Sequence, residues 1–215
     1  MTPSFRSMFE RLRADQRGVQ LVELAITLPV LLTLGLGGIE VANYAISSIR
    51  CSQIAMAVAD NAGRVRDSID EADINELMTG AKLMGAGVQF ADNGRIILSS
   101  LEQNGAKTGQ WIRWQRCSGK KAVTSSYGLE GAGNSDSSLK GMGPADNQIA
   151  ALPGTAVMFV EVVYDYRPIV GNRLLGARTL RYTSAFNARQ RTDQSLKNGS
   201  NLAASRISSC SIYSA

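Results

Sequence analysis

The residue types that most enzymes use for catalysis are scarce in this chain of 215 residues, which contains no histidine. Without an imidazole, neither a Ser/His/Asp triad nor a Cys/His pair can form, and no metal site with a histidine ligand is possible. The densest acidic group, Asp70, Glu71, Asp73 and Glu76, falls at the start of an expected helix, where acids favour the helix dipole. We interpret it as a solvated helix face, and we expect no enzymatic activity, no cofactor and no metal.

The three cysteines, Cys51, Cys117 and Cys210, predict one disulfide bond if their part of the chain lies outside the cytoplasm. Cys117 ends an expected strand and Cys210 lies near the C-terminus, so a bridge between them would fasten an otherwise loose tail. We favour this pair, with Cys51 free. The alternative is a Cys51–Cys117 bridge with Cys210 free.

The basic residues give no indication of nucleic-acid binding. Trp111 and Trp114 alternate with arginines, but in a strand these two tryptophans point to opposite faces, which favours one core and one surface position. The glycines of residues 131–134 lack the Gly-Lys-Ser/Thr ending and the strand-to-helix context of a phosphate-binding loop. Part of the net charge of +5 belongs to the first 18 residues, which contain four arginines and two acids.

An apolar run follows this basic leader. Between Val19 and Ile49 the only charged residues are Glu23 and Glu40, and the run is long enough to cross a hydrocarbon core of about 30 Å. The positive-inside rule predicts a cytoplasmic leader over residues 1–18, a transmembrane helix over 19–45 and a periplasmic domain over 46–215. A removed secretion signal fits less well, because Glu23 interrupts the run and no clear cleavage site follows it.

The junction between leader and run carries the most specific motif. Gly18 precedes the apolar run, Glu23 follows five residues later, and Pro29 lies six residues beyond. This arrangement resembles the processing site of type IV prepilins and, within that class, the TadE-type minor pseudopilins of tight-adherence (Tad) pili. Val162–Gly171, with the pattern V-x-Y-x-Y-R-P-x-V-G, resembles the later part of TadE-like domains.

The resemblance implies a function and a set of partners. A prepilin peptidase of the bacterial inner membrane would cut between Gly18 and Val19, and the apolar helix would stay on the mature protein. That helix and the periplasmic domain would pack against other minor and major pilins and the inner-membrane assembly platform of an adhesive pilus. The alternative is an uncleaved, membrane-anchored periplasmic domain that binds a ligand or a component of the cell envelope.

Glu23 and Glu40 need separate explanations, because a carboxylate in an apolar helix is costly. Cleavage after Gly18 would place a new amino group on Val19, one helical turn from Glu23, where it or that of a neighbouring subunit would neutralise the carboxylate. The alternative is a glutamate that reaches cytoplasmic water. We expect Glu40 to lie exposed at the periplasmic interface.

Small residues mark one face of the expected transmembrane helix. Gly35, Gly37 and Gly38, with Ala42 four residues after Gly38, would allow another helix to approach closely in lipid. We interpret Gly35, Gly38 and Ala42 as a helix-packing site.

An α+β fold is predicted for the whole chain. The first helix should continue to about Val65, and Gly63 marks its expected exit. Its core face should be formed by Ala45, Ile49, Met56 and Ala59. Ser68 and Glu71 suggest a capping box for a second, short helix that ends near Gly85, with Ile74, Leu77, Met78 and Ala81 in the core.

A mainly antiparallel sheet of about four strands should follow the two helices. The segments rich in β-branched and aromatic residues are Arg95–Leu101, Gln110–Cys117, Thr155–Tyr166 and Arg178–Asn187. Alternation in the third of these segments predicts one apolar face. The polar stretch 118–154 shows no period, and we interpret it as a loop that is either mobile or recognised by partners. The tail after Arg191 is similarly polar.

Overall fold

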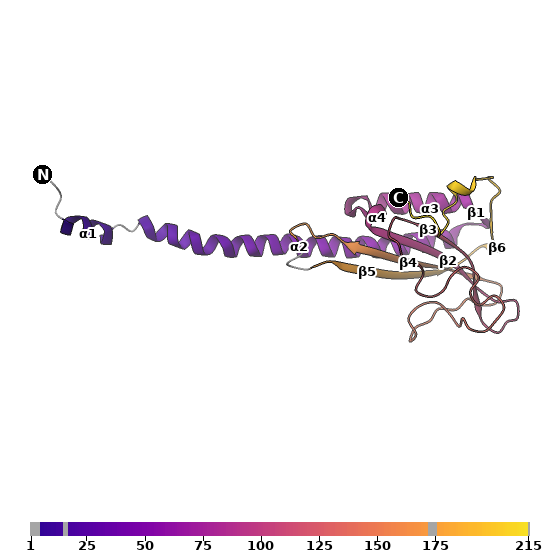
Figure 1. The fold of residues 1–215 in the computed structure, drawn as a ribbon. Helices are drawn as coiled ribbons and strands as arrows, with labels where there is room; N and C mark the ends of the chain where they lie inside the picture. The colour runs from indigo at the N-terminus through magenta and orange to yellow at the C-terminus, as the bar shows by residue number, and fades with distance from the viewer. Residues whose placement is uncertain (1–4, 15–16, 172–175, 215) are drawn as a thin grey trace. The chain divides into compact units, whose positions relative to one another are not determined.

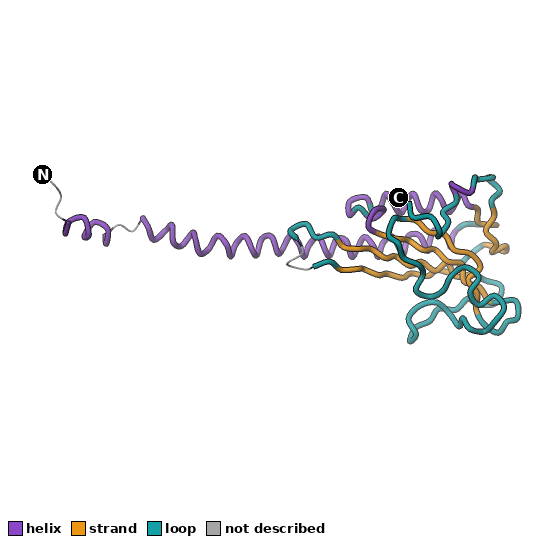
Figure 2. Tube along the Cα trace, viewed as in Figure 1, coloured by secondary structure: helices purple, strands orange, loops and turns teal. Residues whose placement is uncertain are grey.

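The computed structural model of the chain describes residues 5–14, 17–171 and 176–214. The contacts between residues divide the chain into two compact units, and each is described by itself. The first unit contains Met1–Asn43 and Pro168–Gly176, and the second contains Tyr44–Arg167 and Ala177–Ala215. Figure 1 labels the helices and strands, and Figure 2 distinguishes them from the loops.

The long N-terminal helix that the sequence predicts is confirmed. Helix α1 covers Phe5–Ala14, and helix α2 covers Arg17–Arg64, 48 residues with Pro29 inside the helix. The helix ends at Arg64, next to Gly63, which the sequence analysis expected as its exit. At Gly63 the helix lies very close to strand β5, Arg178–Asn187, since a Cβ on this residue would be 2.9 Å from the carbonyl oxygen of Asn187. Only glycine therefore allows the end of α2 to approach the chain so closely.

Helix α3, Glu71–Met84, is the predicted second helix, but its N-terminal cap differs from the prediction. The cap is Asp70, whose side chain accepts a hydrogen bond from the Ala72 amide at 3.0 Å, while Asp73 accepts one from the Asp70 amide at 2.9 Å. Ser68 lies in a strand instead, so its pairing with Glu71 in a capping box was wrong. Asp70 immediately precedes the first helical residue, so its carboxylate reaches the amides of the first turn, whereas Ser68 lies two residues earlier.

Short helical turns connect α3 to the sheet. Gly85 caps the C-terminus of α3, as expected, and the chain continues through η1, Ala86–Val88, and α4, Phe90–Asn93. A Cβ at Gly85 would lie 2.4 Å from the Cβ of Phe90, whose side chain is buried. The glycine lets the chain fold back so that Phe90 enters the core.

The four-stranded antiparallel sheet is confirmed, with its strands in the order β3-β2-β4-β5. Its bounds match the sequence segments closely: β2 Gly94–Gln103, β3 Gln110–Ser118, β4 Ala156–Tyr166 and β5 Arg178–Asn187. The register shifts once between β2 and β3, between Ser100 and Leu101. These strands form because β-branched and aromatic side chains pack well on a buried pleated surface.

A second, two-stranded parallel sheet escaped the sequence analysis. It pairs β1, Asp67–Asp70, with β6, Arg191–Lys197, so the tail after Arg191 is partly a strand. Both strands are short and polar, which gives no hydrophobic alternation to detect. A last helical turn, η2, covers Ala204–Arg206.

The helices cover one face of the four-stranded sheet (Figure 1). The buried face of α2 was predicted only in part: Ala59 is buried, but Ala45, Ile49 and Met56 are exposed. Their neighbours occupy the core instead, and these are Cys51, Ile54, Ala55, Val58 and Ala62. The same core contains Ile74, Met78 and Ala81 of α3, as predicted, and Leu77 packs against it. Apolar residues surround α2, so period alone did not identify the inner face.

The opposite face of the sheet is covered by residues 118–154, which pack against the sheet and are not simply a mobile segment. Leu101, Ile112, Val157 and Phe159 of the strands form a second core with Met142 and Ala151 of this segment. Strand β4 is buried on both faces, so the prediction of a single apolar face was incomplete. Glu161 of β4 accepts hydrogen bonds from the Ser125 hydroxyl and the Ser126 amide and so anchors the segment.

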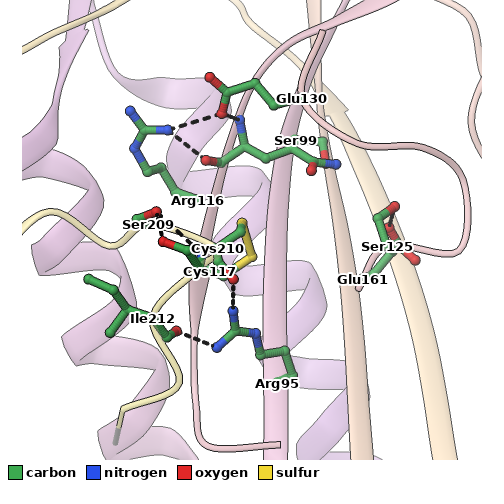
Figure 3. Close-up of a disulfide and its surroundings, with 12 residues drawn as sticks. Arg95, Ser99, Arg116, Cys117, Ser125, Glu130, Glu161, Ser209, Cys210 and Ile212 are labelled. Carbon is green, nitrogen blue, oxygen red and sulfur yellow. Dashed lines mark hydrogen bonds and ion pairs between the residues drawn. A yellow bond between two sulfur atoms is a disulfide. The ribbon is translucent and has the colours of Figure 1, made fainter. Parts of the chain in front are cut away.

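The C-terminal tail is fastened by a disulfide and an arginine (Figure 3). The structure joins Cys117 to Cys210 across 93 residues and leaves Cys51 free and buried, the pairing that the sequence analysis favours. Such a bridge stabilises a fold by about 2–4 kcal/mol. Arg95, fully buried, donates hydrogen bonds to the carbonyls of Cys210 at 2.7 Å and Ile212 at 2.7 Å.

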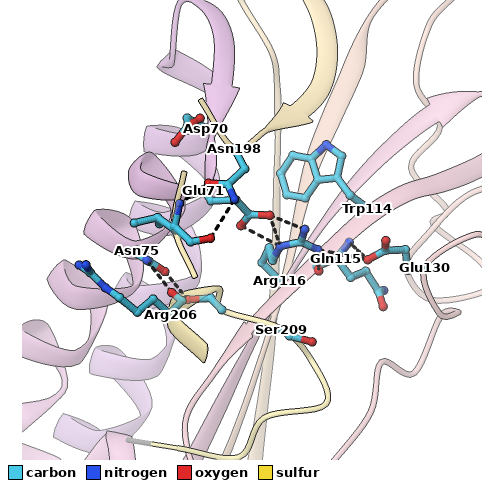
Figure 4. A network of polar contacts seen from close by, with 12 residues as sticks. Asp70, Glu71, Asn75, Trp114, Gln115, Arg116, Glu130, Asn198, Arg206 and Ser209 are labelled. Carbon is cyan, nitrogen blue, oxygen red and sulfur yellow. Dashed lines mark hydrogen bonds and ion pairs between the residues drawn. The ribbon is translucent and has the colours of Figure 1, made fainter. Parts of the chain in front are cut away.

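A buried ion pair connects α3 to β3 (Figure 4). The Arg116 guanidinium binds both carboxylate oxygens of Glu71, with Nε at 3.0 and 2.9 Å, and Arg116 also lies 3.3 Å from Glu130. The Glu71 side chain is only 4% exposed. The interpretation of the acidic cluster as a solvated face was therefore wrong for Glu71, whose charge is balanced by an arginine 45 residues away.

We expect Arg116→Met to destabilise the protein by about 3 kcal/mol, because Glu71 would keep a buried charge without its partner. The matched control is Lys120→Met, which removes an ion pair with Asp92 whose side chains are 53% and 58% exposed. The control should cost less than about 1 kcal/mol. Urea unfolding of the full chain in detergent, followed by tryptophan fluorescence, measures both; equal losses would contradict the prediction.

Glu161 should make stability depend on pH. Burial raises the pKa of its carboxyl group, so the folded state favours the protonated form. The resulting stabilisation is present at low pH and is lost as pH rises from the ordinary glutamate pKa of about 4.3 through the raised value. Glu161→Gln should thus gain thermal stability relative to the unchanged protein as pH rises from 4 to 7. The measurement is the melting temperature of Glu161→Gln minus that of the unchanged protein. If this difference decreases between pH 4 and pH 7, the pKa of Glu161 is not raised in the folded state.

Candidate functional site

The N-terminal half of α2 exposes apolar side chains on all sides. An 18-residue stretch of it has a mean hydropathy of 2.0 with no residue buried, so α2 is long and apolar enough to cross a membrane. Exposed fractions lie between 44% and 69% for Val19, Leu21, Val22, Leu24, Ile26, Leu28, Val30, Leu31, Leu32, Leu34, Leu36 and Ile39. Exposure of so large an apolar surface to water is costly, which makes α2 a candidate membrane span.

Gly18, Val19 and Glu23 lie together in the first two turns of α2. Gly18 borders open space, since a Cβ built on it meets no atom within 4 Å. Val19 is 63% exposed, and among the described residues no ion pair reaches Glu23. The Gly18–Val19 peptide bond is in the first turn of α2, where backbone N–H groups have no partners within the helix.

Two threonines of the same segment, which the sequence analysis did not single out, have their hydroxyl groups hydrogen-bonded within the helix. The Thr27 hydroxyl donates to the Glu23 carbonyl at 2.8 Å, and the Thr33 hydroxyl donates to the Pro29 carbonyl at 2.7 Å. Both polar groups are thereby satisfied inside the helix. Pro29 has no N–H, so the carbonyl of Ala25 lacks its usual donor, and a helix tends to bend at such a point.

The small-residue face is open along its whole length. Gly35, Gly38 and Ala42 are exposed, and a Cβ on either glycine meets no atom within 4 Å. No part of the described chain uses this face, so close helix packing there stays a prediction.

Glu40 corrects the sequence analysis most clearly. We expected an exposed interfacial residue, but Glu40 is fully buried. Its Oε2 accepts hydrogen bonds from two consecutive amides, those of Ile169 at 3.0 Å and Val170 at 2.8 Å. Both amides belong to the first unit and follow Pro168, in the connection between β4 and β5. A buried carboxylate is tolerated when backbone amides stabilise it, and here it also fixes the connection to α2.

Two separate parts of the sequence carry the signal for the contact between Glu40 and the β4–β5 connection. It consists of a lone acid at the end of an apolar helix and of the Y-R-P-x-V-G pattern that ends at Gly171. The two are separated by 129 and 130 residues, and neither indicates the other without the fold.

No metal-binding group is present in the described part of the chain, where no cluster of three or more Cys, Asp or Glu side chains is suitably arranged. The tryptophans differ in burial, but the prediction that they point to opposite faces was wrong. The register shift pairs Trp111 with Glu102 and Trp114 with Ser100, two residues on the same face of β2. Trp114 is buried and donates to the Gln194 carbonyl at 3.1 Å, while Trp111 is half-buried.

Glu40→Ala should release the connection between β4 and β5. The amides of Ile169 and Val170 would lose their acceptor, a loss of about 1–3 kcal/mol in the stability of that contact. Hydrogen exchange of these two amides, measured on the full chain in detergent, should accelerate. Glu40→Gln keeps one carbonyl acceptor and should give an intermediate rate. Unchanged exchange in Glu40→Ala would show that the carboxylate does not hold the connection.

The comparison with known proteins found a similarity only in the region of α2. Neither the curated proteins nor the solved structures contain a match to the chain. The sequence model of one family, described as TadE-like protein, matches residues 18–60, which begin at the predicted processing glycine and end near the close of α2. The resemblance to the TadE-like family, inferred from Gly18, Glu23 and the apolar run, is therefore confirmed over residues 18–60.

Proposed function

We propose that this protein is a minor pseudopilin that takes part in the assembly or initiation of a Tad-type adhesive pilus. The observation that carries the proposal is the match to the TadE-like family over a helix whose apolar side chains are exposed on all sides. A helix of this kind works by packing against lipid and other helices. Its partners would be the other minor and major pilins and the inner-membrane assembly platform.

Processing would follow from the position of Gly18. A prepilin peptidase that removes residues 1–18 needs an extended substrate at the Gly18–Val19 bond, and the first turn of α2 supplies one when it opens. The missing Cβ at Gly18 leaves room for the enzyme. The basic leader keeps this end in the cytoplasm, which places the membrane span at about residues 19–45 and the α+β domain in the periplasm.

Glu23 would then act in assembly. In a membrane its carboxylate needs a positive partner, and the described residues offer none. Cleavage creates one, the amino group of Val19 on the same helix or on a neighbouring one. The face formed by Gly35, Gly38 and Ala42 would let that neighbouring helix approach closely. The domain would act as a packed surface at the start of the fibre.

Gly18→Leu tests the proposal directly. A bulky side chain at the cleavage position should block processing, so the chain extracted from peptidase-containing cells should keep residues 1–18, and pili should be lost. Intact-mass spectrometry and electron microscopy measure the two effects. Gly80→Leu is the matched control, because Gly80 is exposed on α3 and a Cβ there also meets no atom within 4 Å.

Two results would contradict the proposal. An N-terminus at Met1 in unchanged chain from peptidase-containing cells would exclude processing. Normal pili with Gly18→Leu would favour the alternative, an uncleaved periplasmic domain that binds a ligand or an envelope component.

A further inference from the structure

A polar cavity of about 330 Å³ lies between α3, the end of β3 and the C-terminal tail. Its volume is at the lower end of the range of about 300–1,000 Å³ that is usual for small-molecule sites. All of its lining residues belong to the second compact unit and lie outside the residues 18–60 that match the TadE-like family. From α3 come Asn75, Met78, Thr79 and Lys82, whose spacing of three and four residues places them on one face of the helix.

Direct contacts hold the walls of this cavity in place. The Asn75 amide donates a hydrogen bond to the Arg206 carbonyl at 2.8 Å (Figure 4), and its oxygen accepts one from the Ser208 hydroxyl at 2.7 Å. These two bonds join α3 to the tail. The Cys117–Cys210 bridge joins the tail to β3, and so does the bond from the Cys117 amide to the Ser208 carbonyl at 2.7 Å. A ligand would therefore meet a preformed site and would not have to order the tail first.

The charges around the cavity are all positive. The described residues that line it include Lys82 and Arg206 but no aspartate or glutamate, and neither cation belongs to an ion pair in that part of the chain. Lys82 is half-buried and Arg206 is exposed, so both can meet a ligand that enters from solvent. A third cation, the fully buried Arg95, donates a hydrogen bond to the carbonyl of the lining residue Ile212 at 2.7 Å (Figure 3). Such a grouping of positive charges attracts an anion.

Ser118 adds a hydrogen-bond donor to the cavity. It is paired with Ile96 of β2, whose side chain lies in the core below the helices, so the Ser118 side chain is on the same face of the sheet, the one towards α3. Ser118 lines the cavity and is only 6% exposed, and within the described chain its hydroxyl makes no hydrogen bond. The hydroxyl can therefore donate to an oxygen of a ligand without giving up a bond within the protein.

We propose that this cavity binds a small phosphorylated compound through a phosphate monoester group. Such a group carries a charge of about −1.5 to −2 at pH 7, which matches the two lining cations, Lys82 and Arg206. A carboxylate carries a single charge and would leave one of them unpaired. The guanidinium and ammonium groups would bind the phosphate oxygens, and the Ser118 hydroxyl would donate a further hydrogen bond. The proposal depends neither on cleavage after Gly18 nor on a membrane span.

Isothermal titration calorimetry of the full chain in detergent tests the proposal with three related probes. They are glycerol 3-phosphate, glycerate, which carries a carboxylate in place of the phosphate, and glycerol, which carries no charge. We expect glycerol 3-phosphate to bind about tenfold or more tightly than glycerate, because it meets both cations, and we expect no binding of glycerol. Lys82→Gln and Arg206→Gln should each weaken the binding of glycerol 3-phosphate about tenfold or more, since each removes a charged donor.

The matched control is Lys140→Gln, which removes the charge of an exposed lysine that does not line the cavity and should leave the affinity unchanged. The melting temperatures of the three variants show that each is folded. Failure of glycerol 3-phosphate to bind would overturn the proposal, and so would glycerate that binds as tightly. The same holds if the two cavity variants keep the affinity of the unchanged chain, or if Lys140→Gln loses as much affinity as they do, because the charge would then act without a site.

Discussion

The fold depends on one constraint: strand β4 is apolar on both faces and must be covered on both. One cover is the pair of helices α2 and α3, which contribute Ile54, Val58 and Met78. The other cover is the 118–154 segment, which after Ser118, the end of β3, contains no helix or strand but contributes Met142 and Ala151 to the core on that face. Polar contacts then fix each cover in place, Glu71 with Arg116 on the helical side and Glu161 with Ser125 and Ser126 on the other.

The two ends of helix α2 differ in how far they are covered by the rest of the chain. Its C-terminal part has one side buried against the sheet, whereas an 18-residue apolar stretch of its N-terminal part has no buried residue. An uninterrupted helix satisfies both requirements because backbone bonding is internal to the helix and needs nothing from the surroundings. The hydroxyls of Thr27 and Thr33 follow the same rule, since they bond to carbonyls of their own helix.

Local patterns predicted most of the secondary structure. The four strands were found within a few residues because each is a run of β-branched and aromatic residues, and Gly18 with Glu23 indicated a family that the comparison confirmed over residues 18–60. The misses were non-local. Glu40 meets amides 129 and 130 residues away, and the apolar residues of the 118–154 segment follow no period because a loop imposes none. The inner face of α2 was misjudged at Ile49 and Met56 because apolar residues lie on both sides.

The bridge between Cys117 and Cys210 does more than fasten the tail. The tail that it holds supplies the Ser208 carbonyl to the Cys117 amide and the Ser214 carbonyl to the Gly119 amide, and so closes that end of the β3 edge. Without the bridge, the tail would be held by hydrogen bonds alone, among them those that Arg95 donates to the carbonyls of Cys210 and Ile212. Formation of the bridge therefore also fixes the cover of β3 at the C-terminal end of that strand.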